Sequence, residues 1–317
     1  MTIRGRRLVL VTGATGGQGG SVSIELLKKG IRVRALVPDV EIDTARARAL
    51  VVAGAELVKG SFSDSASLRA STEGVDGVFS MQPDGAPASE FRALVDAAVA
   101  AGVEHYVHSS VSGVGEQEAV LGSLEGDMKH DYWTAKVGQE RAVRAAPFRH
   151  RTYLRPSLLI DNMVLRAQFM YPRLASHGDL LVAMKPEQRV SFVSYDTIGR
   201  VAVAAFVDPE RFDNAEIELA DAYVSHAHIA ATLEEITGKR VTVTSVDMAT
   251  AIDMGLAPRV AHSHRWLTDV GYPARPELLA PYGIEPLALR SWVERNAPLI
   301  DIGRAVPPRA APERSGR

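Results

Sequence analysis

The sequence predicts an α/β fold: a doubly wound parallel sheet followed by a smaller, mixed C-terminal lobe. Three observations predict it. Up to about residue 156, short runs of Val, Leu and Ile alternate with helical patterns. Such short apolar runs are typical of parallel strands covered by helices on both faces. Glycines at every third position follow the first run, and the regular alternation ends after Pro156.

The first half of the chain contains six expected strands and five expected helices. The strands are Leu8–Thr12, Ile31–Val37, Glu56–Lys59, Gly77–Ser80, His105–His108 and Arg151–Leu154. The helices between them are Ser21–Lys29, Thr44–Ala53, Ser65–Ser71, Ala88–Ala101 and Asp131–Ala146. The fourth helix shows the helical period best, because its apolar residues recur every three or four positions and form one stripe. These residues are Phe91, Leu94, Val95, Ala98 and Val99.

After Pro156 the pattern becomes irregular. The expected helices are Met163–Ser176, Tyr195–Phe206, Ser225–Thr237, Met248–Met254, Pro258–Asp269 and Pro286–Asn296. The expected strands are Leu180–Met184, Ala215–Ala220 and Arg240–Ser245. We expect residues 157–189 and 216–303 to form a substrate lobe, and residues 190–215 to pack back on a core formed by residues 1–156. Residues 304–317 are rich in Pro and Arg, which predicts a disordered tail.

Composition and charge exclude several classes of function. The formal net charge of −2 gives no electrostatic reason to expect nucleic acid or an anionic membrane as a partner. The chain contains no Cys, which excludes disulfides, thiol nucleophiles and Cys-ligated metals. No stretch approaches the roughly 18 apolar residues of a membrane span, and the apolar run after Arg7 is too short for a signal peptide. We therefore expect a cytoplasmic monomer or homodimer that acts on a small molecule.

The glycine-rich segment after the first strand predicts a dinucleotide-binding site. Gly13 permits a tight turn, Gly16 lets the backbone approach a pyrophosphate, and Gly19 lets the next helix pack closely on the sheet. The amino end of that helix presents unpaired N–H groups and a positive dipole end to phosphates. Together with Thr15 and Gln18 of the same loop, these glycines are the expected phosphate-binding residues of a Rossmann-type sheet.

The segment Tyr132-Trp133-Thr134-Ala135-Lys136 predicts acid–base chemistry. Residues four positions apart share one face of a helix, so Tyr132 and Lys136 are neighbours. A nearby ammonium can lower the pKa of a phenol by up to about three units, which makes it a proton donor or acceptor for a carbonyl and its alcohol. Serine hydroxyls at the end of the fifth strand, in 109–112, would lie at the same crevice. There are two alternatives to a catalytic role. The four-residue spacing of Tyr132 and Lys136 can arise by chance, and the serines can simply cap the turn that follows the strand.

The chain resembles the NmrA-like proteins, which are atypical members of the short-chain dehydrogenase/reductase superfamily. The resemblance rests on the glycine motif Gly13–Val22 and on several later segments. These are Gly54–Gly60, Gly102–Ser110, Lys136 with Glu140, Leu154-Arg155-Pro156 through Asn162, and Val193–Val201. It spans roughly residues 7–300 and is specific in the first 165.

The resemblance implies a Rossmann core that binds NAD or NADP and carries a small substrate lobe. The family includes reductases of quinones, imines, double bonds or carbonyls, and also non-catalytic redox sensors that regulate a partner protein. Many members lack the tyrosine, so the presence of Tyr132 favours an enzyme that transfers a hydride to or from a small to medium apolar substrate. Tyr132 is then the general acid/base and Lys136 binds the ribose. Ser110 matches the superfamily serine, with Ser109 and Ser112 as rivals.

A nucleotide-sugar epimerase or dehydratase would share the Tyr–Lys pair. The C-terminal lobe, however, lacks an obvious basic cluster for a second pyrophosphate.

The choice between NAD and NADP is open at this stage. Family members that prefer NADP often place an arginine directly after the second strand, where this chain has Pro38 and Asp39. A carboxylate beside the ribose favours the 2′-hydroxyl and repels a 2′-phosphate. Arg34 would compensate if its side chain reached the ribose. The resemblance therefore favours NADP, whereas the local chemistry of Asp39 favours NAD.

Five further residues are expected to contact the cofactor. Ser61 and Phe62, after the third strand, would flank the adenine. Met81 and Gln82, after the fourth strand, would line the middle of the cofactor. Pro156 opens the segment that the resemblance places over the nicotinamide.

The histidines do not predict a metal site. His262 and His264 have no nearby carboxylate and are expected on a helix surface. His226 and His228 open a helix, where we expect solvated or capping residues. His108 lies beside the serines, where it either contacts substrate or has a hydrogen-bonded structural role.

Overall fold

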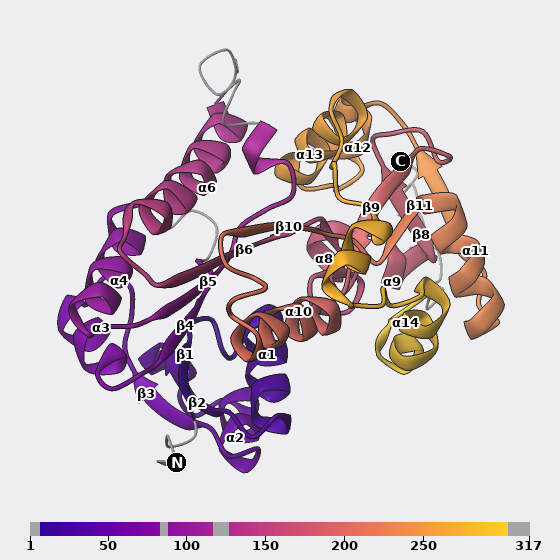
Figure 1. Ribbon diagram of the computed structural model, residues 1–317. Helices are drawn as coiled ribbons and strands as arrows, with labels where there is room; N and C mark the ends of the chain where they lie inside the picture. The colour runs from indigo at the N-terminus through magenta and orange to yellow at the C-terminus, as the bar shows by residue number, and fades with distance from the viewer. Residues whose placement is uncertain (1–6, 83–87, 117–126, 304–317) are drawn as a thin grey trace, which may run out of the picture. The chain divides into compact units, whose positions relative to one another are not determined.

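A parallel sheet of seven strands forms the core of one part of the computed structural model (Figure 1). The structure describes residues 7–82, 88–116 and 127–303, with the backbone alone at 88 and 127–131. The strand order is β10-β6-β5-β4-β1-β2-β3, with parallel pairing throughout. The order reverses between β1 and β4, as in Rossmann sheets, and ligands bind at such a switch point. The predicted fold class is confirmed.

The bounds of the strands follow the predicted apolar runs closely. The main sheet consists of β1 Leu8–Val11, β2 Arg32–Val37, β3 Glu56–Lys59, β4 Gly77–Ser80, β5 His105–Ser109, β6 His150–Pro156 and β10 Ala215–Leu219. A three-stranded sheet contains β7 Leu158–Leu159, β9 Arg189–Val193 and β11 Ala222–Ser225. The sequence analysis did not find these three short strands.

Helices cover both faces of the main sheet (Figure 1). One face carries α1 Gly17–Lys28, α2 Ala45–Val52 and α10 Tyr195–Val207; the other carries α3 Ser65–Thr72, α4 Ala88–Ala100 and α6 Asp127–Ala145. Successive side chains of β1 point to opposite faces of the sheet and pack into the hydrophobic cores on both sides of it. Val9 and Val11 pack with the α1 and α10 side, whereas Leu8 and Leu10 pack with the opposite side. The carboxyl ends of the strands are thereby held at one edge of a rigid sheet.

The chain divides into two compact units. The first comprises residues up to 160, 191–223 and 272–287; the second comprises 161–190, 224–271 and the residues from 288 onward. The first unit therefore contains β10 and the 3₁₀ helix η3 Pro276–Tyr282, which the sequence analysis placed in the smaller lobe. The expected tail, 304–317, lies outside the described residues.

The second unit is mostly helical. It contains α7 Asn162–Leu165, α8 Ala167–Met170, α9 Leu174–His177, α11 His226–Thr237, α12 Met248–Asp253, α13 Pro258–Asp269, α14 Leu289–Asn296 and η4 Ala297–Leu299. Two parallel strands, β8 Asp179–Val182 and β12 Thr242–Ser245, complete it. The continuous helix expected at 163–176 is instead three short ones, because Arg166 and Tyr171 leave the helical conformation. Pro172 follows the second break and cannot continue a helix.

Two histidines of this unit are buried, contrary to prediction. His226 was expected to be solvated, and His264 to lie on a helix surface, but both are buried. His226 shares its helix face with Ile229 and Leu233, at spacings of three and seven residues, and these side chains are fully buried. The Nδ1 atom of His264 accepts a hydrogen bond from the Ala183 N–H at 3.1 Å. Both rings are therefore parts of the core.

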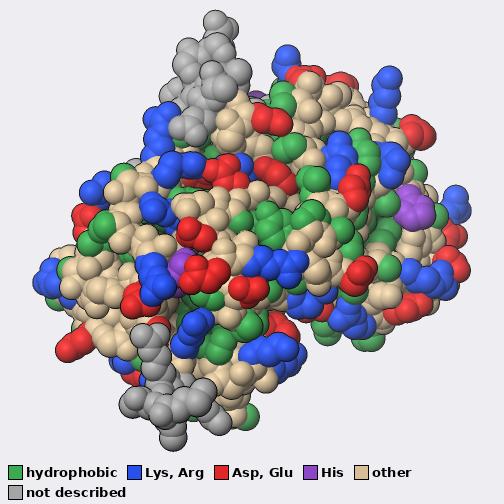
Figure 2. All heavy atoms as spheres, viewed as in Figure 1, with side chains coloured by type: hydrophobic (Ala, Val, Ile, Leu, Met, Phe, Trp, Pro, Cys, Tyr) green, Lys and Arg blue, Asp and Glu red, His purple; other side chains and the backbone are tan. Residues whose placement is uncertain are grey.

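Across the described part of the chain, no helix combines the length and apolarity that a membrane crossing requires. Figure 2 shows Lys and Arg side chains interspersed with Asp and Glu side chains over the visible face.

Candidate functional site

The glycine-rich loop forms a tight turn from β1 into α1. Gly13 has a φ of 62°, a left-handed conformation that favours glycine, and its carbonyl accepts a hydrogen bond from the Gly16 N–H at 2.9 Å. The helix begins at Gly17, earlier than the predicted Ser21. A Cβ atom added at Gly19 would lie 2.4 Å from the Gly13 oxygen, so only glycine allows this approach. The first N–H groups of α1 consequently lie at the carboxyl end of β1.

Two side-chain contacts join this loop to the neighbouring strands. The Thr12 hydroxyl donates to the Met81 carbonyl at 2.9 Å and accepts from the Met81 N–H at 3.0 Å. Gln18, in the first turn of α1, accepts a hydrogen bond from the Ser109 hydroxyl at 2.7 Å. The ends of β1, β4 and β5 are thus linked at the switch point.

Two carboxylates follow β2, and they make different contacts. Asp39 forms an exposed ion pair with Lys59 at 2.8 Å. Glu41, two residues later, accepts a hydrogen bond from the Thr15 hydroxyl. Arg46 of α2 donates to the Thr15 carbonyl at 3.4 Å. An acidic and a basic side chain therefore meet at one residue of the expected phosphate-binding loop.

Arg34 does not act as the compensating cation that the sequence analysis considered. Its guanidinium donates to Glu56 Oε1 at 3.0 Å and to the carbonyls of Ser71 and Glu73 at 3.1 and 2.6 Å. These contacts hold it beside β3 and the end of α3.

The remaining predicted cofactor residues contact the protein as follows. Ser61 donates its N–H to Ser67 Oγ at 3.2 Å, and Phe62 is partly buried against the core beneath α3 and α4. Gln82 is buried and accepts a hydrogen bond from the Gln139 amide of α6 at 2.7 Å. Pro156 is the last residue of β6. Ser61, Phe62, Gln82 and Pro156 all follow or end strands at the same edge of the sheet.

Tyr132 and Lys136 share one face of α6, as their spacing predicts. The Lys136 ammonium nitrogen lies 5.8 Å from the centre of the Tyr132 ring. Lys136 is buried, with only 7% of its surface exposed, whereas Tyr132 is half-buried. The ammonium therefore lies over the face of the phenol ring, where a cation is attracted by the ring electrons.

The three candidate serines differ in what their hydroxyls contact. Ser109 donates to Gln18, and Ser112 donates to Glu218. The Ser110 hydroxyl is buried and has no hydrogen-bond partner among the described residues. Ser110 is therefore the one of the three whose hydroxyl has no hydrogen bond within the described part of the chain.

His108 is a neutral core residue close to Lys136. Its Nδ1 atom is 2.9 Å from the Ser80 hydroxyl, and its ring centre is 4.9 Å from that of Phe91. Burial, together with the positive charge of Lys136, lowers the pKa of His108 to about 3. The hydrogen-bonded structural alternative thus describes His108 in this structure.

An ion cluster centred on the buried Arg155 and Glu140 holds α6 against the sheet. Arg155 of β6 forms two parallel hydrogen bonds with Glu140, at 3.0 and 2.8 Å, and a further ion pair with Glu216 of β10 at 2.8 Å. Glu140 lies one helical turn after Lys136. The sequence analysis noted Glu140 and Arg155 only as part of the resemblance, because spacing gives no sign that they meet.

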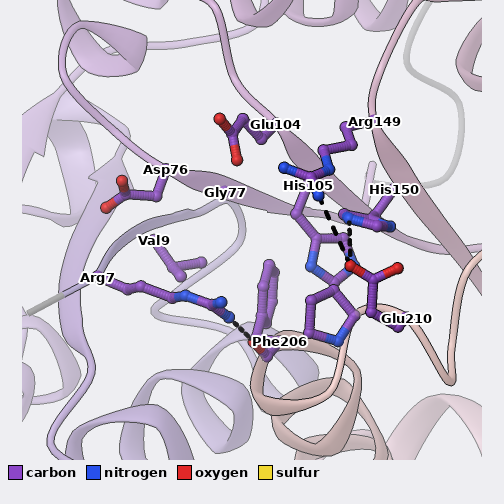
Figure 3. A pocket seen from close by; sticks show the side chains of 11 residues that line it. Arg7, Val9, Asp76, Gly77, Glu104, His105, Arg149, His150, Phe206 and Glu210 are labelled. Carbon is purple, nitrogen blue, oxygen red and sulfur yellow. Dashed lines mark hydrogen bonds and ion pairs between the residues drawn. The ribbon is translucent and has the colours of Figure 1, made fainter. Parts of the chain in front are cut away.

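A cavity of about 740 Å³ lies at the opposite, amino-terminal edge of the main sheet (Figure 3). Several of its charged side chains already bind within the protein. Arg7 donates to the Phe206 carbonyl, Asp76 accepts from the Leu8 N–H, and Glu210 lies 3.7 Å from His150. These pairs join the strand starts to the end of α10. Among the described residues, no group of three or more His, Asp or Glu side chains could hold a metal ion.

Comparison with known proteins identifies the family. The model of the NmrA-like family matches residues 5–294. The chain belongs to this family. The resemblance inferred from the glycine motif and the later segments is thereby confirmed.

Two relatives and one solved structure illustrate the similarity. The NAD(P)H azoreductase of Xenophilus azovorans is 26% identical, over 77% of this chain and 79% of that protein. The (4-alkanoyl-5-oxo-2,5-dihydrofuran-3-yl)methyl phosphate reductase of Streptomyces griseus is 30% identical, over 81% and 84%. The triphenylmethane reductase of Citrobacter sp., solved with NADP(H), has a TM-score of 0.70 at 21% identity, over 90% and 99%. At that identity the structure shows a shared fold.

Proposed function

We propose that this protein is an NAD(P)(H)-dependent oxidoreductase whose substrate is a small to medium, apolar carbonyl, quinone, imine or activated alkene. One observation carries the proposal. Lys136 is buried with its ammonium 5.8 Å from the centre of the Tyr132 ring, and the buried hydroxyl of Ser110, just after β5, has no hydrogen-bond partner among the described residues. The relatives named as an NAD(P)H azoreductase and a reductase support the same class of reaction.

The glycine turn fits the diphosphate of a dinucleotide. A side chain at Gly19 would collide with the backbone of the turn, and Gly16 caps the helix in an extended conformation. The N–H groups at the start of α1 have no helical partners and favour negative charge. Gln18, held by Ser109, lies in the same first turn. The backbone N–H groups at the start of α1 would therefore bind the phosphates of the dinucleotide.

The chemistry then depends on three side chains. When bound, the nicotinamide supplies or accepts a hydride. The Tyr132 hydroxyl donates a proton to the substrate oxygen or nitrogen that gains negative charge when the neighbouring carbon receives the hydride, or removes that proton in the reverse direction. Lys136 stabilises the phenolate that this transfer leaves. Ser110 donates a hydrogen bond to the substrate oxygen or nitrogen and orients it.

The test is Tyr132→Phe, with Tyr282→Phe of η3 as the matched control. Tyr282 packs its ring against Phe212, with ring centres 5.2 Å apart, and removal of its hydroxyl preserves that contact. We expect Tyr132→Phe to lose about 10²–10⁴-fold in kcat while dinucleotide affinity, measured by calorimetry, stays within about twofold. The assay follows nicotinamide absorbance with a panel of quinones, ketones, imines and enones.

Two outcomes would contradict the proposal. Full turnover by Tyr132→Phe would remove the tyrosine from the chemistry. Clear dinucleotide binding by the unaltered protein, with no oxidation of reduced cofactor across the panel, would favour the redox sensor that regulates a partner protein.

A further inference from the structure

Glu41 and Arg46 converge on the glycine-rich loop from the segment that follows β2. Glu41 accepts a hydrogen bond from the Thr15 hydroxyl, and Arg46 donates to the Thr15 carbonyl at 3.4 Å. Thr15 lies between Gly13 and Gly16, within the turn expected to hold the phosphates. Both charged groups are therefore held beside that turn, at the carboxyl ends of β1 and β2.

In a Rossmann sheet this position is next to the adenosine ribose. A carboxylate there bonds the 2′-hydroxyl of NAD, whereas a guanidinium there accommodates the 2′-phosphate of NADP. This chain has both a carboxylate, Glu41, and a guanidinium, Arg46, beside the glycine turn. The preference for NAD or NADP therefore depends on which of the two groups lies closer to the 2′ position of the ribose. The ordering of the carboxylate by Thr15 favours Glu41, because a fixed negative charge repels a phosphate.

We propose that Glu41 makes this protein selective for NAD(H) over NADP(H), and that Arg46 is the cation that would receive a 2′-phosphate once the carboxylate is removed. This proposal rests on the proposed function only in requiring a dinucleotide site at the glycine turn. It assigns the selectivity to a residue four positions after the end of β2, and not to Asp39.

Asp39 is a poorer candidate for this role. Its carboxylate is paired with Lys59 at 2.8 Å, and its side chain is 78% exposed. The contact joins the ends of β2 and β3, so the charge of Asp39 is largely balanced by a neighbouring cation. Glu41, by contrast, bonds a hydroxyl of the glycine turn itself.

The experiment measures the binding of ADP-ribose and of 2′-phospho-ADP-ribose by calorimetry. Neither probe carries a nicotinamide, so the result does not depend on hydride transfer and can succeed even if the oxidoreductase assignment fails. The variants are E41Q, E41Q/R46Q and D39N. The exposed Asp43, two residues after Glu41, supplies the matched control D43N.

We expect the unaltered protein to bind ADP-ribose at least tenfold more tightly than the 2′-phosphorylated probe. E41Q should shift this ratio at least tenfold toward the phosphorylated probe, and E41Q/R46Q should reverse most of that gain. D43N and D39N should change the ratio of the two dissociation constants by less than about twofold. In the unaltered protein, high salt should bring the two dissociation constants closer together, because salt screens the repulsion between carboxylate and phosphate.

Three results would overturn the inference. An unaltered protein that binds both probes equally, or prefers the phosphorylated one, has no carboxylate-based selectivity. A ratio unchanged by E41Q but shifted by D39N would assign the role to Asp39. Failure of the protein to bind either probe would reject the dinucleotide site, and the proposed function with it.

Discussion

Mild acid is expected to destabilise this protein, because at least four of the described histidines are buried in neutral form. Burial lowers the pKa of His105, His108 and His264 to about 3, and that of His226 to about 4. In an unfolded chain, histidine has a pKa of about 6.5. Between these values the unfolded chain binds a proton that the folded chain does not. The free energy of unfolding therefore falls as the pH drops below about 6.5.

The magnitude follows from the number of buried rings in each unit. One histidine of this kind costs about 1.4 kcal/mol per pH unit. His105 and His108 belong to the first unit, and His226 and His264 to the second. Because the unfolded histidine is only half protonated at pH 6.5, each ring contributes about 1 kcal/mol between about pH 6.5 and 5.5, and each unit should lose about 2 kcal/mol. This is a large part of the roughly 5–15 kcal/mol that stabilises an ordinary domain.

The sharpest assay compares His226→Gln with His228→Gln, an exposed position two residues later on α11. Urea unfolding is followed by tryptophan fluorescence at about pH 7.5, 6.5 and 5.5. Trp266 and Trp292 both lie in the second unit and report on its unfolding. His226→Gln should lose about 1 kcal/mol less than the unaltered protein between the two lower pH values, whereas His228→Gln should match it. An unchanged pH slope in His226→Gln would refute the reasoning.

Three further predictions concern the site and its supports. Gly19→Ala should abolish measurable dinucleotide binding in calorimetry and destabilise the fold by about 1–3 kcal/mol, because the added Cβ would meet backbone oxygen atoms of the glycine turn. The control is Gly138→Ala on α6, where an added Cβ meets no atom of the described structure within 4 Å. Arg155→Met should cost about 3–5 kcal/mol in urea unfolding, because the buried Glu140 then keeps only the longer ion pair with the half-exposed Arg144 at 3.5 Å. Arg155→Met/Glu140→Met should recover much of this loss, and equal stability of the two variants would exclude this explanation. Ser110→Ala should reduce kcat while changing stability by less than about 0.5 kcal/mol, because its hydroxyl has no partner among the described residues; a large stability loss with normal turnover would show a structural role instead.

The main sheet was largely predictable, because its strands are short apolar runs separated by helices of clear period. β10 was assigned to the wrong lobe for a physical reason. Glu216 and Glu218 alternate with apolar residues, a pattern typical of a strand with one solvated face. In the structure Glu216 pairs with Arg155 at 2.8 Å, and Glu218 lies 3.8 Å from the same guanidinium. Ion pairs with Arg155, and not solvent alone, therefore account for the carboxylates on that face.

The site was predictable only where spacing determines geometry. A four-residue interval predicts that Tyr132 and Lys136 share a helix face, and the contact of the Lys136 ammonium with the ring agrees with it. Spacing cannot say which carboxylate after β2 meets the glycine turn. Pro38 and the 3₁₀ turn at Asp39–Glu41 direct the first carboxylate to Lys59 and the second to the turn. That outcome depends on loop conformation, which a single sequence does not reveal.

The packing of α10 on α1 determines when the glycine turn can acquire its final shape during synthesis. Val22 and Leu26 of α1 belong to the same core as the apolar face of α10. Gly199 approaches so closely that an added Cβ would lie 2.6 Å from the Ser21 hydroxyl oxygen. A nascent chain released only as far as residue 160 still exposes this face and the open edge of β6. The glycine turn is thus synthesised before α10 and β10, and we expect it to become a stable scaffold only after both have left the ribosome.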